Sequence, residues 1–338
     1  MEVEKNNLKE LNFAKNKINS WYAREGNKML NIISRPYNSS ILFSEIIFSL
    51  LKKNKKVVYI INGYDNNWEL IKYIKEHLGD IRYSYVKQLN GTIENGVLYF
   101  ISSSNVDVLK EEIELIIYDD ITSFSNCSKL QITERIERVY RYTNKIIIYS
   151  IESVFNNIQK LELGGILNSY PMIEPRFITT RINLEEDIPY LLYEYFKWFK
   201  ENGRRVVIHT PSKDSADKVY ELYKNKISIF SDVTVIRFSE QDEIKKFEKR
   251  ITNQKEPVMI ITEYIGESLK TFGNIDVIVL KAHKSRFDYK KIVFLCGKVG
   301  YRNSEFGEMI LVANEITSSM EKAKEITREL NKLVWEKQ

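Results

Sequence analysis

The sequence predicts an α/β protein made of two domains, each built on a parallel sheet. Short runs of β-branched and aromatic residues alternate with longer amphipathic segments along almost the whole chain, as in repeated strand-helix-strand units. With 338 residues, the chain is long enough for two domains of ordinary size. Residues 168–190 hold three prolines and show no sustained period. We therefore expect domains at residues 1–172 and 188–338, joined by a linker at 173–187.

The first half of the chain contains several candidate strands, each a short run rich in Val, Ile and Tyr. They are expected at residues 29–34, 56–62, 81–86, 97–102, 115–120 and 145–150. Helical patterns fill most of the gaps between them. Residues 40–53 place Ile and Leu on one side of a helix, and residues 129–144 behave similarly.

The second half restarts the same rhythm after the prolines. Strands are expected at residues 205–210, 233–238, 258–262, 275–282 and 308–313. Helices are expected from about residue 190, at 214–225, at 242–251, between the last two strands, and at 318–335. This order again favours a parallel sheet with crossover helices.

Composition excludes several classes of protein. Apolar residues make up 43% of the chain and charged residues 29%, which is ordinary for a globular protein. Two cysteines and three scattered histidines argue against a zinc cluster, a disulfide framework and metal-based catalysis. The polar start lacks the apolar core of a signal peptide, and the longest apolar run, residues 41–51, is too short to span a bilayer. We expect a cytoplasmic protein without a membrane span, and a net charge of +5 permits a polyanionic partner without requiring one.

Two adjacent aspartates, Asp119 and Asp120, end the strand that begins at Leu115. Ligands bind at the carboxyl edge of open parallel sheets, and a carboxylate there can hold Mg²⁺ beside a nucleotide phosphate. A helix cap or a solvated turn would use the same two residues. Both interpretations stay open on this stretch alone.

Three segments of the second half resemble motifs of superfamily 2 helicases, whose motors are paired RecA-like domains of the P-loop NTPase type. Residues 205–224 resemble a strand, a Ser/Thr-rich turn and a helix, and residues 258–282 resemble the next motif, in which the helix carries Arg-Gly. Residues 290–335 resemble the last motif, Gln-x-x-Gly-Arg-x-Gly-Arg, with its closing strand and helix. A closer similarity, carried by "TFGNIDVIVLKA", "GEMILVAN" and "LNKLVW", is to the late-competence helicase-like protein of the comF operon (ComFA), a DNA-uptake protein.

The resemblance implies two tandem RecA-like domains and places "LIIYDDITSF" at the Asp-Glu box. Asp119 is then the acid that organises a metal, and Asp120 replaces the glutamate that activates water. The four-cysteine zinc module often seen at the start of the ComFA family is absent from the sequence.

The expected phosphate-binding loop, "RPYNSS" at residues 35–40, departs from the family pattern. Pro36 has no N–H to donate, Tyr37 and Asn38 replace small or flexible positions, and Ser39 stands where the lysine would be. Ser39 and Ser40 remain candidates for nucleotide contact. Capping of the following helix is the alternative role for them, and the one that we favour.

The other positions at which such helicases contact the nucleotide also differ. The replacements are Ser268-Leu269 for the Arg-Gly pair, Phe294 for the glutamine, Lys298 for the first arginine and Tyr301 for the arginine finger. Gly297 is kept, and Arg302 is a candidate substitute for the finger. Lysine cannot make the planar two-pronged contact of arginine, and loss of a finger alone costs roughly 10³- to 10⁵-fold in rate. We therefore expect little or no ATP hydrolysis, and whether the chain is an enzyme stays open.

Nucleic-acid contacts in these motors are mostly hydroxyls, backbone amides and basic side chains on phosphates, which tolerate substitution. The candidates by position are Thr210, Ser212, Lys213, Thr262, Lys284 and Arg286. For the last two, a solvated charged surface is an equal alternative.

The resulting hypothesis is a degenerate helicase-like protein that binds single-stranded DNA or a DNA-uptake or recombination protein, with no cofactor. One alternative is an active but divergent DNA translocase that uses Mg-ATP, with Mg²⁺ at Asp119. Another is a protein-binding scaffold that does not contact nucleic acid.

Overall fold

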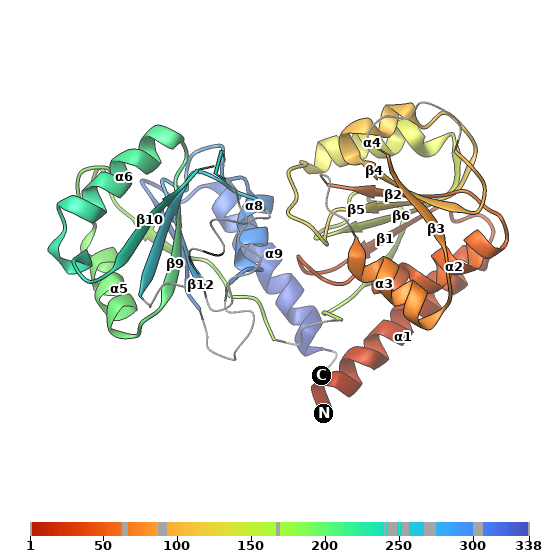
Figure 1. Ribbon diagram of the computed structural model, residues 1–338, viewed down its shortest axis with the longest axis horizontal. Helices are drawn as coiled ribbons and strands as arrows, with labels where there is room; N and C mark the ends of the chain where they lie inside the picture. The colour runs from red at the N-terminus through yellow and green to blue at the C-terminus, as the bar shows by residue number, and fades with distance from the viewer. Residues whose placement is uncertain are drawn as a thin grey trace. The chain divides into compact units, whose positions relative to one another are not determined.

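The computed structural model describes residues 2–62, 67–86, 93–166, 170–239, 241–242, 249, 251, 257–266, 275–299 and 307–336, with side chains from residue 8 onward. The chain forms two compact units (Figure 1). Unit 1 comprises Met1–Pro171 with Glu329–Gln338, and unit 2 comprises Met172–Arg328.

Unit 1 is built on a seven-stranded parallel sheet in the order β3-β4-β2-β5-β6-β1-β7. The strands are β1 (Met29–Ile33), β2 (Val57–Ile61), β3 (Arg82–Val86), β4 (Val97–Ser102), β5 (Ile113–Asp119), β6 (Thr143–Ser150) and β7 (Gln159–Glu162). The central strands β2 and β5 are almost wholly buried, as expected for strands covered on both faces. Because β5, β6 and β1 are neighbours, the loops that follow them meet at the carboxyl edge of the sheet.

Helices cover both faces of this sheet (Figure 1). On one face lie α1 (Glu2–Ala23), η1 (Ile41–Phe43), α2 (Ser44–Lys52) and α3 (Trp68–His77), and on the other lie η2 (Ser103–Val108) and α4 (Lys129–Tyr140). Helix α1, which sequence analysis did not predict, buries Leu11, Ala14, Ile18 and Trp21 at helical spacing.

Unit 2 is built on a six-stranded parallel sheet in the order β10-β11-β9-β12-β13-β8. The strands are β8 (Arg176–Thr179), β9 (Arg205–His209), β10 (Thr234–Phe238), β11 (Val258–Thr262), β12 (Ile275–Leu280) and β13 (Met309–Ala313). On one face, α5 (Tyr190–Glu201) and α6 (Lys213–Asn225), with η3 (Ser228–Phe230), pack Leu192, Phe196 and Tyr223 into the core. The other face carries α8 (Tyr289–Cys296) and the start of α9 (Ser318–Trp335) (Figure 1).

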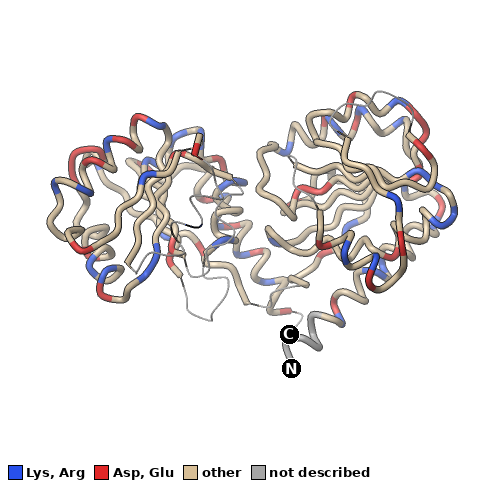
Figure 2. The backbone as a smooth tube through the Cα atoms, viewed as in Figure 1, with Lys and Arg blue, Asp and Glu red and all other residues tan. Residues whose placement is uncertain are grey.

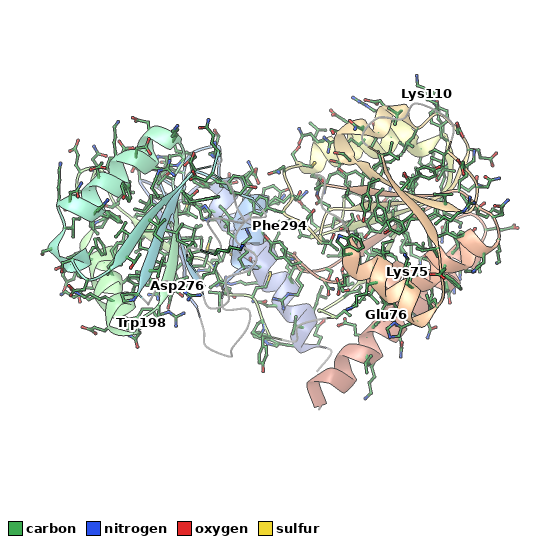
Figure 3. The ribbon with its side chains drawn as sticks, in the orientation of Figure 1. Lys75, Glu76, Lys110, Trp198, Asp276 and Phe294 are labelled. Carbon is green, nitrogen blue, oxygen red and sulfur yellow. The ribbon has the colours of Figure 1, made fainter. Side chains whose placement is uncertain are left out.

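A buried ionic network fixes the amino end of the second sheet. Arg204 lies just before β9, and its guanidinium donates two hydrogen bonds to the carboxylate of Asp276 on β12. They run from Nη2 to Oδ1 at 2.7 Å and from Nε to Oδ2 at 2.8 Å. The Tyr195 hydroxyl donates to Oδ2 at 2.7 Å, and the Glu308 N–H donates to Oδ1 at 2.9 Å. Arg204 also lies over the ring of Trp198, which is labelled with Asp276 in Figure 3. The network joins four segments of unit 2 through one carboxylate.

The predicted fold class is confirmed, because both sheets are parallel and their strands alternate with helices along the chain. Besides helix α1, two strands differ from expectation: residues 159–162 form β7, and residues 176–179, expected in the linker, form β8 and pair with β13. Strands β7 and β8 were missed because each has only four residues and lies half-exposed at a sheet edge. The helix expected at 242–251 lies largely outside the described residues.

None of the helices in the described part of the chain is both long enough and apolar enough to cross a membrane.

Candidate nucleotide and nucleic-acid sites

The loop from β1 to η1 lies where a phosphate-binding loop would lie. Hydrogen bonds to other protein groups, however, use the N–H groups and hydroxyls that would otherwise face a phosphate. Tyr37 has a φ of 61°, in the left-handed region that glycine adopts most easily. Its N–H donates to the carbonyl of Ile121, in the loop after β5, at 2.8 Å. An N–H used in this way is turned into the protein, whereas a phosphate cradle directs such groups at the ligand.

The side chain of Asn38 ties the loop together from inside. Its Nδ2 donates to Ser34 Oγ at 2.7 Å. Its Oδ1 accepts the N–H groups of Ser39 and Ile166, each at 2.9 Å. The amide oxygen of Asn38 thus accepts a loop N–H that would face a phosphate oxygen in a working cradle.

The two loop serines bond to the start of α3. Ser39 Oγ donates to Glu69 Oε1 at 3.0 Å and accepts the N–H of Ile41, in η1, at 3.1 Å. Ser40 Oγ donates to Asn67 Oδ1 at 2.7 Å. Ser39 thus accepts one N–H of η1, whereas Ser40, the N-cap residue of η1, makes no side-chain cap bond and bonds to another segment. The predicted capping role of the two serines stays a prediction. Glu69 also brings a negative charge to the place where a nucleotide-binding loop supplies a lysine, which opposes a polyphosphate.

Asp119 is a buried carboxylate whose oxygens are fully used by its own surroundings. Oδ1 accepts the N–H groups of Ile121 at 2.9 Å and Thr122 at 3.0 Å. Oδ2 accepts the hydroxyls of Tyr59, at 2.7 Å, and of Thr122. Two carboxylate oxygens offer about four lone-pair sites, so a metal at Asp119 would have to displace one of these donors. The residues present therefore do not fit a Mg²⁺ site in this arrangement.

Asp120 is also buried and bonded within the fold. Its Oδ1 accepts Asn62 Nδ2 at 2.8 Å and Ser125 Oγ at 2.5 Å, and its N–H donates to the carbonyl of Tyr149. The pKa of Tyr59 is raised well above its usual range, mainly by burial and secondly by the negative charge of Asp119. The Tyr59 hydroxyl therefore stays protonated and donates its hydrogen bond at neutral pH. The two aspartates therefore form the centre of a buried turn, in place of a solvated one. In the described residues, no group of three or more His, Cys, Asp and Glu side chains is placed to hold a metal ion.

In unit 2, the structure brings four of the predicted nucleic-acid residues to one sheet edge. Thr210 directly follows β9 and Thr262 ends the neighbouring strand β11, and the Thr210 N–H donates to the carbonyl of Thr262 at 2.9 Å. Both threonines are buried. Ser212 Oγ accepts the N–H of Ser215 at 3.2 Å and so caps α6, and Lys213 lies in the first turn of that helix. Ser212 and Lys213 are exposed, so they are the members of the group that can meet a ligand.

The basic run that follows β12 is mostly engaged with the protein itself. Lys281 forms an ion pair with Glu185, and Lys291 forms one with Asp288 at 3.1 Å. Arg286 is exposed and donates from Nη2 to the carbonyl of Glu263, the residue after Thr262, at 2.8 Å. Lys284 is exposed as well. Figure 2 shows basic and acidic positions interspersed along the outer helices of each unit.

The remaining predicted nucleotide residues divide between buried and undescribed positions. Gly297 is the C-cap residue that follows α8, and its N–H donates to the carbonyl of Val293. Lys298 is buried and its ammonium donates to the carbonyl of Gly266. Ser268, Leu269, Tyr301 and Arg302 lie outside the described residues.

Lys298 lies near a buried histidine that makes unit 2 sensitive to acid. Burial and then the charge of Lys298 lower the pKa of His209 to about 3, and its Nδ1 donates to the carbonyl of Tyr264 at 3.1 Å. The folded chain therefore keeps His209 neutral at pH values where the unfolded chain protonates it. The stability from this difference is complete above about pH 6.5 and falls as the pH drops toward the folded pKa.

We expect His209→Asn, which keeps an N–H donor without titrating, to flatten this pH dependence. Between about pH 7 and pH 5, the wild type should lose about 2 kcal/mol more unfolding free energy than the variant. Equilibrium urea unfolding of both proteins at the two pH values measures the difference. Carboxylates that titrate in both proteins cancel in the comparison, so parallel pH profiles would contradict the assignment.

Sequence reasoning missed the partners that close the nucleotide loop. Asn67 caps α3 by accepting the N–H of Leu70, and an Asn before an apolar helical pattern is a cap signal that the sequence does carry. The pairing of Glu69 with Ser39 joins segments 30 residues apart, which no local pattern encodes.

Comparison with solved structures finds this two-unit architecture in helicases. S. cerevisiae Dbp5 bound to RNA and ADP BeF3 matches with a TM-score of 0.50 at 12% identity, over 92% of this chain and 84% of that chain. The Escherichia coli DEAH/RHA helicase HrpB matches with a TM-score of 0.52 at 12% identity, over 92% of this chain and 43% of that chain. RecG bound to a three-way DNA junction matches with a TM-score of 0.51 at 11% identity, over 96% of this chain and 44% of that chain.

The chain thus spans less than half the length of HrpB and RecG. No family model and no curated protein matches the sequence. At these identities the likeness concerns the fold alone, and the chain has the tandem RecA-like fold that these three proteins have.

Proposed function

We propose that the chain is a helicase-like protein that binds single-stranded DNA and has lost ATP hydrolysis, or retains it only very weakly. The observation that carries this proposal is the closure of the nucleotide loop by Asn38, Ser39 and Glu69. The support for nucleic acid as the ligand is the fold, which is shared with proteins solved on RNA and on a DNA junction.

The energetic argument against tight triphosphate binding rests on what the loop would have to give up. A phosphate needs the N–H of Ser39, which Asn38 now accepts, and it would lie near the carboxylate of Glu69. Each exchanged hydrogen bond costs about 1 kcal/mol, and an added like charge raises that cost. Asp119 would lose one of its four donors to hold Mg²⁺. These costs act together on one ligand, so we expect them to weaken ATP binding as well as turnover.

The proposed nucleic-acid edge of unit 2 consists of the exposed residues Ser212, Lys213, Lys284 and Arg286. Phosphate contacts of this kind depend on charge and hydroxyl placement more than on one exact geometry. They therefore persist more easily than a catalytic pocket does. The DNA-uptake role implied by the resemblance to ComFA, and a partner from that machinery, stay predictions.

ATP turnover in the presence of single-stranded DNA tests the proposal. We expect a rate at least about 10³-fold below that of a working motor, because the finger position and the loop lysine are both replaced. The control is Asp119→Asn, assayed at a temperature at which thermal melting shows it folded, and any residual rate should be the same in this variant as in the wild type. A motor-like rate that Asp119→Asn abolishes would favour the active translocase instead.

Oligonucleotide binding at two salt concentrations separates the proposal from the scaffold alternative. A nucleic-acid site should lose affinity steeply as salt rises, because phosphate contacts release bound counterions. Lys213→Gln and Arg286→Gln should each lower the slope, while Lys200→Gln, on a lysine paired with Asp232, should not. Affinity that is absent at both salt concentrations would favour the scaffold.

A further inference from the structure

A pair of glycines after β7 presents two backbone N–H groups to one carboxylate from α1. The N–H of Gly164 donates to Glu10 Oε1 at 2.7 Å, and the N–H of Gly165 donates to Glu10 Oε2 at 3.0 Å. Successive N–H groups that converge on one point, as these do, form a concavity that binds anions. Here the anion is a side chain of the same protein, 154 residues from Gly164 in the sequence.

The glycine segment, residues 164–166, is buried and lies beside the nucleotide loop. Strands β1 and β7 are parallel neighbours, so the segments that follow them share the carboxyl edge of the sheet, where parallel sheets bind ligands. The N–H of Ile166 donates to Asn38 Oδ1 at 2.9 Å, and the same oxygen accepts the N–H of Ser39. Four N–H groups of two neighbouring segments thus end on two side chains, of which Glu10 is the charged one.

Contacts other than those of Glu10 hold the glycine segment in place. The N–H of Leu163 donates to the carbonyl of Ile33, the last residue of β1, at 2.9 Å. A Cβ on Gly164 would lie 2.8 Å from the carbonyl oxygen of Leu333, in the part of α9 that belongs to unit 1. The backbone of α9 therefore packs directly against this glycine. We expect the two N–H groups to keep their arrangement when the Glu10 carboxylate is removed.

Glu10 lies at the border between the packed and the exposed parts of α1. Leu11 is the first buried residue among the described side chains of this helix, and the buried stripe continues to Trp21. Leu8, on the other side of Glu10, has 59% of its surface exposed. Rotation of the Glu10 side chain away from the glycines would therefore open the two N–H groups without loss of the apolar packing of α1.

We propose that the N–H groups of Gly164 and Gly165 form a binding site for a small oxyanion, free phosphate, and that Glu10 occupies this site as an internal competitor. A carboxylate and a phosphate each offer two oxygens to such a pair of donors. A phosphate of a nucleotide has the same chemistry, but the Glu69 carboxylate at the neighbouring Ser39 opposes a chain of phosphates. The site lies in unit 1 and requires no nucleic acid, so the inference goes beyond the proposed function.

Hydrogen exchange of the peptide that contains Gly164 and Gly165 tests this site, with sodium phosphate as the probe and sodium chloride of equal ionic strength as the reference. Glu10→Ala removes the carboxylate and leaves a space close to the size of a phosphate ion. In chloride, the two glycine amides should exchange faster in this variant than in the wild type. Phosphate at roughly ten times its Kd should then slow their exchange about 11-fold, the factor 1 + [L]/Kd. In the wild type, phosphate should give no such protection, because Glu10 occupies the site.

Glu134→Ala is the matched control, because Glu134 is an exposed carboxylate on α4 in the same unit. Its glycine peptide should exchange like that of the wild type in both salts, which corrects for the general stabilisation of folded proteins by phosphate. Glu10→Gln keeps one acceptor oxygen, so phosphate should protect it less than it protects Glu10→Ala. Thermal melting should show that each variant is folded at the temperature of the measurement.

If phosphate slows the exchange equally in Glu10→Ala and Glu134→Ala, or in neither, the inference is wrong. The proposed function then stands, because ATP turnover and oligonucleotide affinity of the wild type test it separately. If ATP without Mg²⁺ protects the glycine peptide of Glu10→Ala at a lower concentration than phosphate does, the ligand is a nucleotide and the choice of free phosphate is wrong.

Discussion

Asp276→Ala is expected to lower the free energy of unfolding of unit 2 by about 3–5 kcal/mol, the cost of removing one partner of a buried ion pair. The carboxylate of Asp276 is fully buried and the Arg204 side chain is only 10% exposed. Without the carboxylate, the guanidinium keeps its charge in a site with little water, and the Tyr195 hydroxyl and the Glu308 N–H lose their acceptor. Burial and the charge of Asp276 both raise the pKa of Tyr195, as expected for a phenol held against a carboxylate.

Hydrogen exchange resolved by segment measures this loss. Peptides from β9 and β12 should exchange roughly 10²- to 10⁴-fold faster in the variant, since each 1.4 kcal/mol is a factor of ten. The peptides of unit 1 should change far less, because the network lies within unit 2.

Two further variants separate an ionic cause from a general packing defect. Asp232→Ala breaks the exposed pair with Lys200 in the same unit and should leave exchange near the wild-type rate. Arg204→Met combined with Asp276→Leu removes both charges and should restore part of the missing protection. If Asp276→Ala and the double variant lose protection from hydrogen exchange equally, the unpaired charge of Arg204 is not the cause of the destabilisation.

The sequence was sufficient for the framework because buried strands leave a strong local signal. Strands such as β2 and β11 are short, wholly buried runs of β-branched and aromatic residues, and their alternation with helices requires parallel sheets. The short edge strands β7 and β8 carry weaker signals, since half-exposed four-residue strands need little hydrophobicity. Helix α1 buries apolar residues at helical spacing. Its many charged residues made this pattern hard to recognise in the sequence.

The candidate site was predictable in its position but not in its chemistry. Topology alone places the loops after β1 and β5 at one sheet edge, and the sequence showed that the lysine and glycines were missing. The groups that take their place come from distant segments: Asn67 and Glu69 reach the loop from α3, and Ile166 reaches it from beyond β7. Such pairings depend on tertiary packing. A sequence motif can therefore show that a nucleotide-binding residue is missing without showing which residue of another segment takes its place.

Asp119→Ala is expected to destabilise unit 1 by about 3–5 kcal/mol while leaving oligonucleotide affinity near the wild-type value at temperatures where the variant is folded. The physical reason is the number of donors that depend on Asp119: the N–H groups of Ile121 and Thr122, and the hydroxyls of Tyr59 and Thr122. Removing the carboxylate leaves them buried without an acceptor, at about 1–3 kcal/mol for each group that water cannot reach. Faster exchange of the β5 and β6 peptides would report the loss.

Asp119→Asn gives a graded test of the same role. Its amide keeps one oxygen, which can still serve the two backbone N–H groups, but its NH₂ would face the hydroxyls of Tyr59 and Thr122. Hydroxyls can turn to accept a hydrogen bond, whereas backbone N–H groups cannot, so the loss of stability should be smaller than in Asp119→Ala. A catalytic acid predicts no such difference in stability: both variants would fold like the wild type and lose ATP turnover equally. The relation between the two variants therefore distinguishes a carboxylate that holds a turn from one that holds a metal.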